Sequence, residues 1–303
     1  MPELPEVQTT VNGINDEVKG LSITDAWTDY KSLFHANKQN IKNPEYFSQF
    51  KKDVVKAKIT GASRKGKNVL IHLSNGNTIL THMKMTGHFM YGKYVFAKKK
   101  WTPADPTGPL GDPYNRHIHL LFTLSDKNHL AFADLRKFAK VFVFKTKDEH
   151  EVLDLMHLGP DPLSKNFSYE LFKEKILKRS NGRIKQVLMD QTLISGIGNI
   201  YSDEILWSAS VHPESKPGKI PATNLKKMYE ASKEILKKGI NFGGDSDSDY
   251  RNIYGEKGKF QSKHNAYRRT GEKCPKHDGG IIERKMIAGR SGHFCPKHQK
   301  LYK

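Results

Sequence analysis

Short runs in which apolar and polar residues alternate fill the first half of the chain, a pattern typical of strands with one buried face. Five such runs end at turn sequences such as Asn75-Gly76: 68–73, 78–83, 116–124, 129–135 and 140–144. A helix is expected near Pro5, because proline suits a first helical turn and acidic residues suit its positive end. The stretch 92–114, with its lysines and prolines, predicts a long loop.

Beyond residue 150 the apolar spacing becomes helical, in four runs: 168–179, 184–190, 200–208 and 223–239. The glycine- and aspartate-rich stretch 241–259 predicts a mobile loop, and the tail returns to short strands and turns. The pattern indicates an α+β protein with a β-rich N-terminal domain, a helical C-terminal domain and a small appended module. We place these parts at 1–145, 146–262 and 263–303.

Composition narrows the class of protein. The 303 residues carry a formal net charge of +19 with 36% hydrophobic content, which suits a globular protein that binds polyanions. Residues 251–303 hold 14 lysines and arginines against 4 acidic residues, so nucleic acid is the favoured partner. Acidic residues at the N-terminus and the lack of a long apolar run favour an intracellular protein, in cytoplasm or nucleus, with no membrane contact.

Two copies of one short motif point to a metal site. Cys274-Pro-Lys-His277 and Cys295-Pro-Lys-His298 are separated by 17 residues and contain both cysteines of the chain. Two thiolates and two imidazoles suit tetrahedral Zn²⁺, and four protein ligands indicate a structural ion, here one zinc and no other cofactor. The alternative is a chance repeat with surface histidines.

The N-terminus offers a nucleophile. Removal of Met1 would expose a secondary amine at Pro2, and an α-amino group keeps a neutral fraction near physiological pH. Such an amine can attack a sugar carbon and form an iminium, and Glu3 and Glu6 lie close enough in sequence to transfer protons. The alternative is that proline and acidic residues only begin a helix.

A glycine turn separates two of the predicted helices. Gly196 and Gly198 allow close backbone approach to a ligand, and free N–H groups at the start of the second helix attract phosphate. Lys185 and Asn199 can add side-chain donors. An ordinary helix-turn-helix packing unit is the alternative.

Taken together, these features resemble the formamidopyrimidine-DNA glycosylase/endonuclease VIII family over nearly the whole chain. The matching stretches include Pro2-Glu-Leu-Pro-Glu-Val7, His82-Met-Lys-Met-Thr-Gly87, Asp134-Leu-Arg-Lys-Phe138, Leu158-Gly-Pro-Asp-Pro-Leu163 and Gly289-Arg290-Ser291 ahead of Cys295. The resemblance implies a two-layer β-sandwich with an N-terminal helix, a helix–two-turn–helix domain and a zinc-finger β-hairpin. It also implies a monomer that acts on damaged DNA, and a loop at 241–261 that covers the extruded base.

The resemblance implies a bifunctional DNA N-glycosylase and abasic-site lyase that excises oxidised bases by β,δ-elimination. Pro2 would be the nucleophile, Glu3 the proton donor and Glu6 its support. Lys67 would assist β-elimination, and Arg290 the δ step. The implied DNA contacts are Met85, His117, Arg136, Phe138, Lys185 and Asn199, of which Met85 and Phe138 would fill the gap left by the base.

The chain departs from the family pattern at two places. Histidines stand at 277 and 298 where bacterial members commonly have cysteines, and Leu135, Lys137 and Ala139 replace the usual residues around Phe138. The preferred lesion and the strand context stay open. The competing class is a non-enzymatic zinc-finger protein that binds nucleic acid, which explains the charge and the metal motif but leaves the N-terminal proline and acids unexplained.

Overall fold

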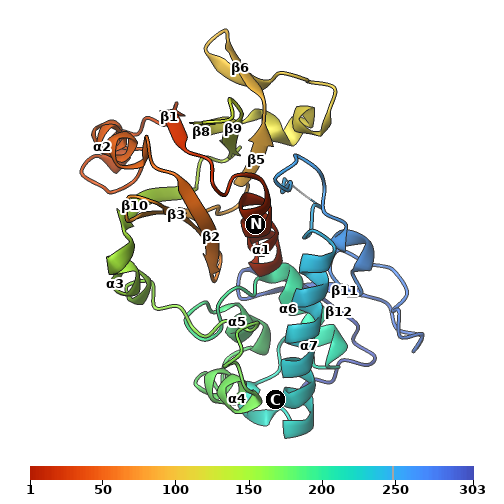
Figure 1. Ribbon diagram of the computed structural model, residues 1–303. Helices are drawn as coiled ribbons and strands as arrows, with labels where there is room; N and C mark the ends of the chain where they lie inside the picture. Colours follow the sequence, from red (N-terminus) through yellow and green to blue (C-terminus); the bar gives the residue numbers. More distant parts are fainter. Residues whose placement is uncertain (248) are drawn as a thin grey trace. The chain divides into compact units, whose positions relative to one another are not determined.

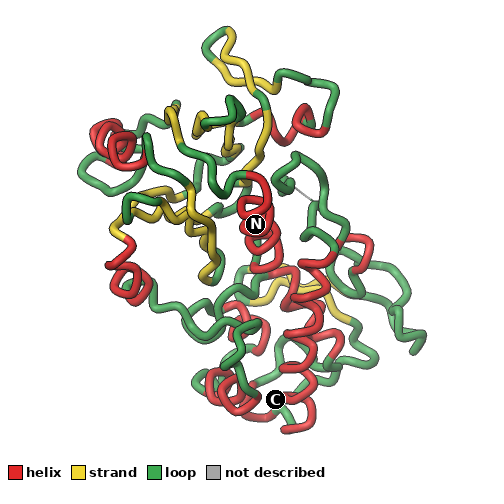
Figure 2. Tube along the Cα trace, viewed as in Figure 1, coloured by secondary structure: helices red, strands yellow, loops and turns green. Residues whose placement is uncertain are grey.

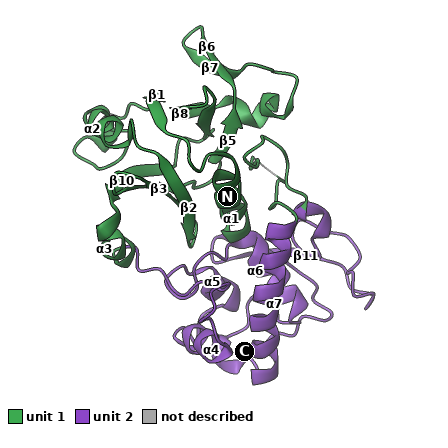
Figure 3. Cartoon of the chain, in the orientation of Figure 1, with its two compact units in different colours: residues 1–155, 242–259 green, residues 156–241, 260–303 purple. Residues whose placement is uncertain are grey.

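The computed structural model describes residues 1–247 and 249–303, which form two compact units (Figure 3). Unit 1 comprises Met1–Leu155 together with Phe242–Lys259, and unit 2 comprises Met156–Asn241 together with Phe260–Lys303. Strands dominate unit 1 and helices dominate unit 2 (Figure 2). The segment 242–259 therefore packs with the β-rich unit, although helices precede it in the chain.

Unit 1 is built on two four-stranded antiparallel sheets (Figure 1). The strands of the first sheet are, in spatial order, β1 (Ile23–Thr28), β8 (Ile118–Leu124), β9 (His129–Ala133) and β5 (His88–Gly92). Those of the second are β10 (Lys140–Lys145), β4 (Asn77–His82), β3 (Asn68–Leu73) and β2 (Ile59–Lys65). One hydrophobic cluster joins Phe122 and Phe132 of the first sheet to Ile71 and Val141 of the second. The expected two-layer β-sandwich is confirmed.

Helix α1 (Leu4–Glu17) closes one side of the sandwich, where it contacts β2 and β3 of one sheet and β5 of the other. Val7, Val11 and Ile14 recur at helical spacing and are fully buried or nearly so. Pro5 lies in the first turn, as the sequence predicted. Because both sheets contact α1, the residues just before this helix are held by the core.

Several elements of unit 1 lie outside the predicted runs, among them strands β1, β2 and β5. The expected loop 92–114 is wrong in part, because it contains a hairpin of β6 (Tyr94–Ala97) and β7 (Lys100–Pro103). Lys98 and Lys99 both adopt positive φ in its two-residue turn, a conformation that their residue type does not signal. Helix α2 (Pro44–Val54) was also missed, although Asn43 caps it by accepting a hydrogen bond from the N–H of Glu45. A further short helix, α3, spans Glu149–Asp154.

Unit 2 holds four main helices, and each agrees with a predicted run to within two residues at either end. They are α4 (Tyr169–Leu177), α5 (Ile184–Met189), α6 (Asn199–Ser208) and α7 (Ala222–Asn241). Helix α6 contacts α5, α7 and the second strand of a hairpin formed by β11 (Glu283–Ile287) and β12 (Arg290–Phe294). Ala288 and Gly289 form the hairpin turn, both at positive φ. Among the described residues, no helix is long and apolar enough to cross a membrane.

A buried carboxylate fixes the turn that follows β9. Asp134 is fully buried and accepts hydrogen bonds from the Tyr30 hydroxyl at 3.2 Å, the Thr86 hydroxyl at 2.6 Å and the Ala139 N–H at 2.8 Å. Thr86 in turn accepts the N–H of Arg136 at 3.0 Å. The turn after β9 is therefore tied to the turn before β5 through one side chain.

Replacing Asp134 with alanine should lower the free energy of unfolding by about 3 kcal/mol, because three buried donors lose their acceptor. Urea unfolding of Asp134→Ala beside Asp16→Ala, a change at an exposed residue of α1, measures the effect. The control should stay within about 0.5 kcal/mol of the parent protein. Equal stability of the two variants would contradict the role given to Asp134.

Candidate functional site

The N-terminus of α1 gathers the residues that the sequence singled out as reactive. Pro2 is buried, and Glu3 and Glu6 are each only 1% exposed. The N–H of Glu3 donates to Glu6 Oε2 at 2.7 Å within a capping box at the start of the helix. The structure thus brings Pro2, Glu3 and Glu6 together, and the positive end of the helix favours their carboxylates.

The segment 242–259 reaches the same carboxylate. The N–H of Asp245 donates to Glu6 Oε1 at 2.7 Å, and the Tyr250 hydroxyl donates to the Glu6 carbonyl oxygen at 3.0 Å. Burial raises the pKa of Tyr250 far above its usual range, so this hydroxyl keeps its proton. Gly244 has φ +83°, and a Cβ there would lie 3.0 Å from Glu6 Cγ. Glu6 is therefore enclosed by both segments.

Lys67 lies in the turn between β2 and β3 and is 6% exposed. Burial, followed by the positive charges of Lys84 and Lys67, lowers the pKa of His82 to about 3. This imidazole is therefore neutral at physiological pH. The charge of Lys67 thus lowers the pKa of His82, the last residue of β4. Lys67 is therefore a buried cation of unit 1 and not a solvent-exposed one.

The four expected DNA contacts of unit 1 lie on turns. Met85 is half-buried between β4 and β5, and Arg136 and Phe138 lie on the turn after β9 that Asp134 fixes. Phe138 is 52% exposed, and the Arg136 guanidinium carbon lies 4.6 Å from the centre of its ring. The carbonyl of His117 accepts the N–H of Asp134 at 2.9 Å, which joins His117 to the same group of turns. A half-exposed aromatic ring beside a cation is available to a ligand.

Lys185 is fully buried in unit 2, in contrast with a solvated surface lysine. Its Nζ lies 2.6 Å from Asp203 Oδ1, 3.1 Å from the Ser202 hydroxyl and 3.2 Å from the Asn199 carbonyl oxygen. An ammonium has three N–H donors, so these acceptors match its whole donor set. The second carboxylate oxygen of Asp203 accepts the N–H of His293 at 3.0 Å.

The glycine turn before α6 is held by one side chain. Gln191 donates from Nε2 to the carbonyls of Met189 and Ile197, at 2.8 and 2.7 Å, and accepts the N–H of Gly196 at 2.9 Å. At the start of α6, the side-chain oxygen of Asn199 is buried without a hydrogen-bond partner among the residues that the structure describes. Such a group marks a place where a ligand or a water can complete the hydrogen bonds.

Arg290 is exposed at the start of β12, next to the hairpin turn. It lines a cavity of about 310 Å³ together with Lys185, Gln186 and Ile287. Residues from α5 and from the hairpin therefore share one hollow within unit 2. Its lining includes two cationic residues, the exposed Arg290 and the buried Lys185.

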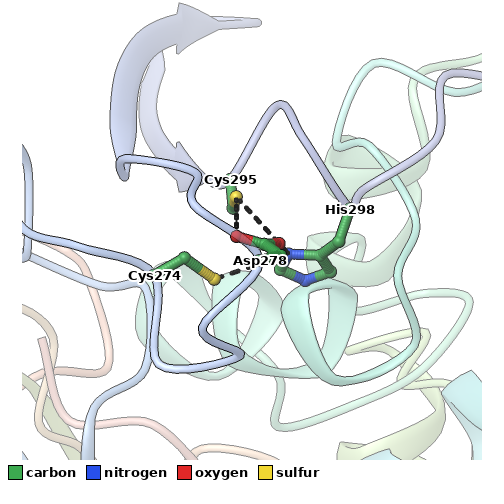
Figure 4. A group of neighbouring side chains, drawn as sticks. All are labelled: Cys274, Asp278, Cys295 and His298. Atoms are coloured by element: carbon green, nitrogen blue, oxygen red, sulfur yellow. Dashed lines mark hydrogen bonds and ion pairs between the residues drawn. The ribbon is translucent and has the colours of Figure 1, made fainter.

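A candidate metal site lies at the end of the hairpin away from its turn (Figure 4). Ligand atoms of Cys274, Asp278, Cys295 and His298 lie within 4.8 Å of one another, and their side chains point toward a common centre. His298 Nε2 lies 3.2 Å from the carbonyl oxygen of Trp207, which accepts its proton and leaves Nδ1 facing the group. Three of the expected ligands are thus brought together.

The fourth expected ligand, His277, is exposed and lies outside the group found among the described residues; Asp278 occupies its place. Asp278 was not predicted as a ligand, because the repeated motif contains only cysteine and histidine as metal-binding residues. Asp203, which pairs with Lys185, was not predicted either. A search for buried acids opposite each expected cation could have found Asp203.

Comparisons with known proteins agree with this arrangement. Residues 1–141 match the Formamidopyrimidine-DNA glycosylase N-terminal domain, and residues 158–251 match the Formamidopyrimidine-DNA glycosylase H2TH domain. The chain is 34% identical to the Formamidopyrimidine-DNA glycosylase of Pelotomaculum thermopropionicum over 301 residues, which cover 99% of this chain and all of the relative. Identity to the Bacillus subtilis protein of that name is 33%, with 99% of each chain covered.

Solved structures agree as well. A complex between the Lactococcus lactis Fpg and DNA containing an abasic site matches with a TM-score of 0.82 at 30% identity, over 98% of this chain and 99% of that one. Both parts of the chain, the sandwich unit and the helical unit, therefore have counterparts in one known protein. This chain belongs to the formamidopyrimidine-DNA glycosylase family.

Proposed function

We propose that this protein is a DNA-repair enzyme that excises oxidised bases from DNA and cleaves the strand at the resulting abasic site. Family membership over the whole chain supports both activities. The observation that carries the proposal is the buried group at the start of α1, where Pro2 adjoins Glu3 and Glu6. A protein that only bound nucleic acid would not need a buried proline directly after Met1 and beside two acidic residues.

The proposed chemistry begins with removal of Met1, which frees the amine of Pro2. This amine bonds to C1′ of the damaged nucleotide, the base leaves, and Glu3 donates a proton to the ring oxygen as the sugar opens. The product is an iminium, which acidifies the neighbouring sugar protons. Loss of one proton expels the 3′ phosphate with help from Lys67, and a second elimination expels the 5′ phosphate with help from Arg290.

DNA contacts are proposed in both units. Base extrusion leaves a gap in the duplex and costs a few kcal/mol, least for a damaged pair. We assign Met85 and the half-exposed ring of Phe138 to that gap, and Arg136 and His117 to the neighbouring backbone. The net charge of +19 also supports DNA binding, because DNA carries one negative charge per phosphate.

In unit 2 we assign phosphate binding to the cavity that Arg290 and Lys185 line, with Asn199 at the start of α6. The exposed guanidinium of Arg290 can meet a phosphate directly. Lys185 must exchange one of its three acceptors to do so, and the Asn199 carbonyl, at 3.2 Å, is the longest of those contacts. Such contacts position DNA without reading its sequence.

We propose that one structural Zn²⁺ ion is held by Cys274, Cys295 and His298, with Asp278 as the fourth ligand. Sulfur, nitrogen and carboxylate ligands all suit zinc, and the Trp207 carbonyl supplies the hydrogen bond that orients the imidazole. The ion would brace the end of the hairpin that carries Arg290 and would take no part in the reaction.

Pro2→Gly should abolish the cross-link that borohydride traps on DNA with an abasic site. The glycine amine is not held by a ring, and its imine is neutral unless protonated, whereas proline gives a permanently charged iminium. Pro5→Ala, a second change to a buried proline at the same end of α1, should cross-link like the parent protein. An undiminished cross-link in Pro2→Gly would refute the assignment of the nucleophile.

Arg290→Ala should reduce the magnitude of the slope of log affinity against log salt by about one, on any lesion duplex, because one phosphate contact is lost. Arg284→Ala is the matched control, since Arg284 is also an exposed hairpin arginine, on β11. Its slope should change less. If the two variants give the same slope, Arg290 has no special place in DNA binding.

Asp278→Ala should lose most bound zinc when the purified protein is analysed for metal, while His277→Ala should keep close to one equivalent. The reason is that Asp278 belongs to the group of neighbouring ligand atoms and His277 is exposed. Cys274→Ser, which removes a thiolate ligand, serves as the positive control for metal loss. The opposite ranking of Asp278→Ala and His277→Ala would restore His277 as the fourth ligand.

A further inference from the structure

The segment 242–259 forms a loop with a closed neck. The N–H of Lys259 donates to the Phe242 carbonyl at 2.7 Å, and the N–H of Gly258 donates to the Ser246 hydroxyl at 2.8 Å. A Cβ on Gly258 would lie 2.2 Å from the Gly244 carbonyl oxygen, so the chain segments at Gly244 and Gly258 are in close contact. Its composition predicts mobility, yet compact loops of this kind are commonly fixed by contacts of their own side chains.

Arg251 makes several of these contacts. Its side chain is fully buried, and Nη2 donates to both carboxylate oxygens of Asp112 at 3.1 Å. Nη1 donates to the carbonyl of Tyr250 at 2.8 Å, and the guanidinium carbon lies 4.7 Å from the centre of the Tyr114 ring. A buried guanidinium is costly unless it is paired, so this arrangement commits the loop to the segment that carries Asp112.

A second tie lies four residues further along the loop. Asn115 Nδ2 donates to the carbonyl of Gly255 at 3.1 Å and to that of Pro109 at 3.0 Å. Gly255 has φ +81°, and a Cβ there would lie 2.8 Å from Asn115 Nδ2 and 2.9 Å from the Pro109 carbonyl oxygen. Backbone therefore approaches backbone here as closely as glycine allows.

We propose that the segment 109–115 is a clamp that holds the loop 242–259 in one arrangement before DNA binds, with Asp112 and Asn115 as positioning residues. The inference rests on the proposed function, together with the expectation from the family resemblance that the loop at 241–261 covers the extruded base. The loop is then attached to unit 1 at two places. Glu6 accepts the N–H of Asp245, and Asp112 of the clamp accepts hydrogen bonds from the guanidinium of Arg251. The loop is already ordered in the free protein, so binding of the base does not have to supply the free energy needed to order it.

Asp112→Asn tests the clamp. It removes the negative charge under Arg251 but keeps an oxygen that can accept the Tyr114 N–H, which Asp112 now accepts at 2.9 Å. Asp105→Asn is the matched control, because Asp105 is exposed in the same unit and accepts hydrogen bonds from the N–H and the hydroxyl of nearby Thr107. Asn115→Ala is a second variant, which deletes the tie to Gly255 and leaves the Arg251 pair intact.

Two measurements are compared for each variant. Hydrogen exchange of the loop amides in the free protein should speed up at least about tenfold in Asp112→Asn and stay unchanged in Asp105→Asn. Single-turnover excision of 8-oxoguanine should fall about tenfold in Asp112→Asn, whereas cleavage at a preformed abasic site, which has no base to cover, should stay within about twofold.

Unchanged loop exchange in both Asp112→Asn and Asn115→Ala would overturn the clamp. Equal losses of excision and abasic-site cleavage would do the same, because they would indicate general damage rather than loss of base coverage. If the parent protein performs neither reaction, the proposed function fails, and the exchange data alone still decide whether the segment 109–115 fixes the loop.

Discussion

The buried carboxylate of Glu6 is the constraint on which unit 1 depends. It accepts the N–H of Glu3 at the start of α1 and the N–H of Asp245 in the loop, and its own backbone carbonyl accepts the Tyr250 hydroxyl. A buried charge is tolerated only where hydrogen bonds replace water, so these partners cannot be dispensed with. Glu6 therefore contacts both the start of α1, next to Pro2, and one end of the loop, which couples the proposed nucleophile to the proposed cover of the base.

Unit 2 applies the same principle at two consecutive acids of α6. Asp203 pairs with Lys185 and accepts the N–H of His293 on β12. Glu204, 1% exposed, accepts three backbone N–H groups, those of Asn265, Ala266 and Tyr267, at 2.8 to 2.9 Å. The hairpin and the segment leading to it are thus attached to a helix by buried carboxylates, and the proposed metal ion would brace the end of the hairpin away from its turn. The hairpin that carries Arg290 is therefore attached to α6 and, in the proposal, held by the metal ion as well.

Local pattern was enough for much of this architecture. Strand β3 begins and ends where alternation predicted, and the hairpin turn at Ala288 and Gly289 lies within the predicted module. What the sequence could not show are contacts between distant residues: Arg251 and Asp112 are 139 positions apart, and no spacing rule joins them. The β6–β7 hairpin escaped for a related reason, because Trp27, distant in sequence, supplies the aromatic packing for Phe96 and Trp101.

The central claim is that the amine of Pro2, exposed by removal of Met1, and not the amine of a lysine, bonds to the DNA sugar. The most direct test is to reduce the reaction mixture with borohydride on DNA containing 8-oxoguanine, digest the cross-linked protein and locate the adduct by mass spectrometry. The account predicts a single adduct on the N-terminal peptide, on a chain that has lost Met1 and begins at Pro2. An adduct on Lys67, or on any other lysine, with the N-terminal peptide unmodified would contradict it.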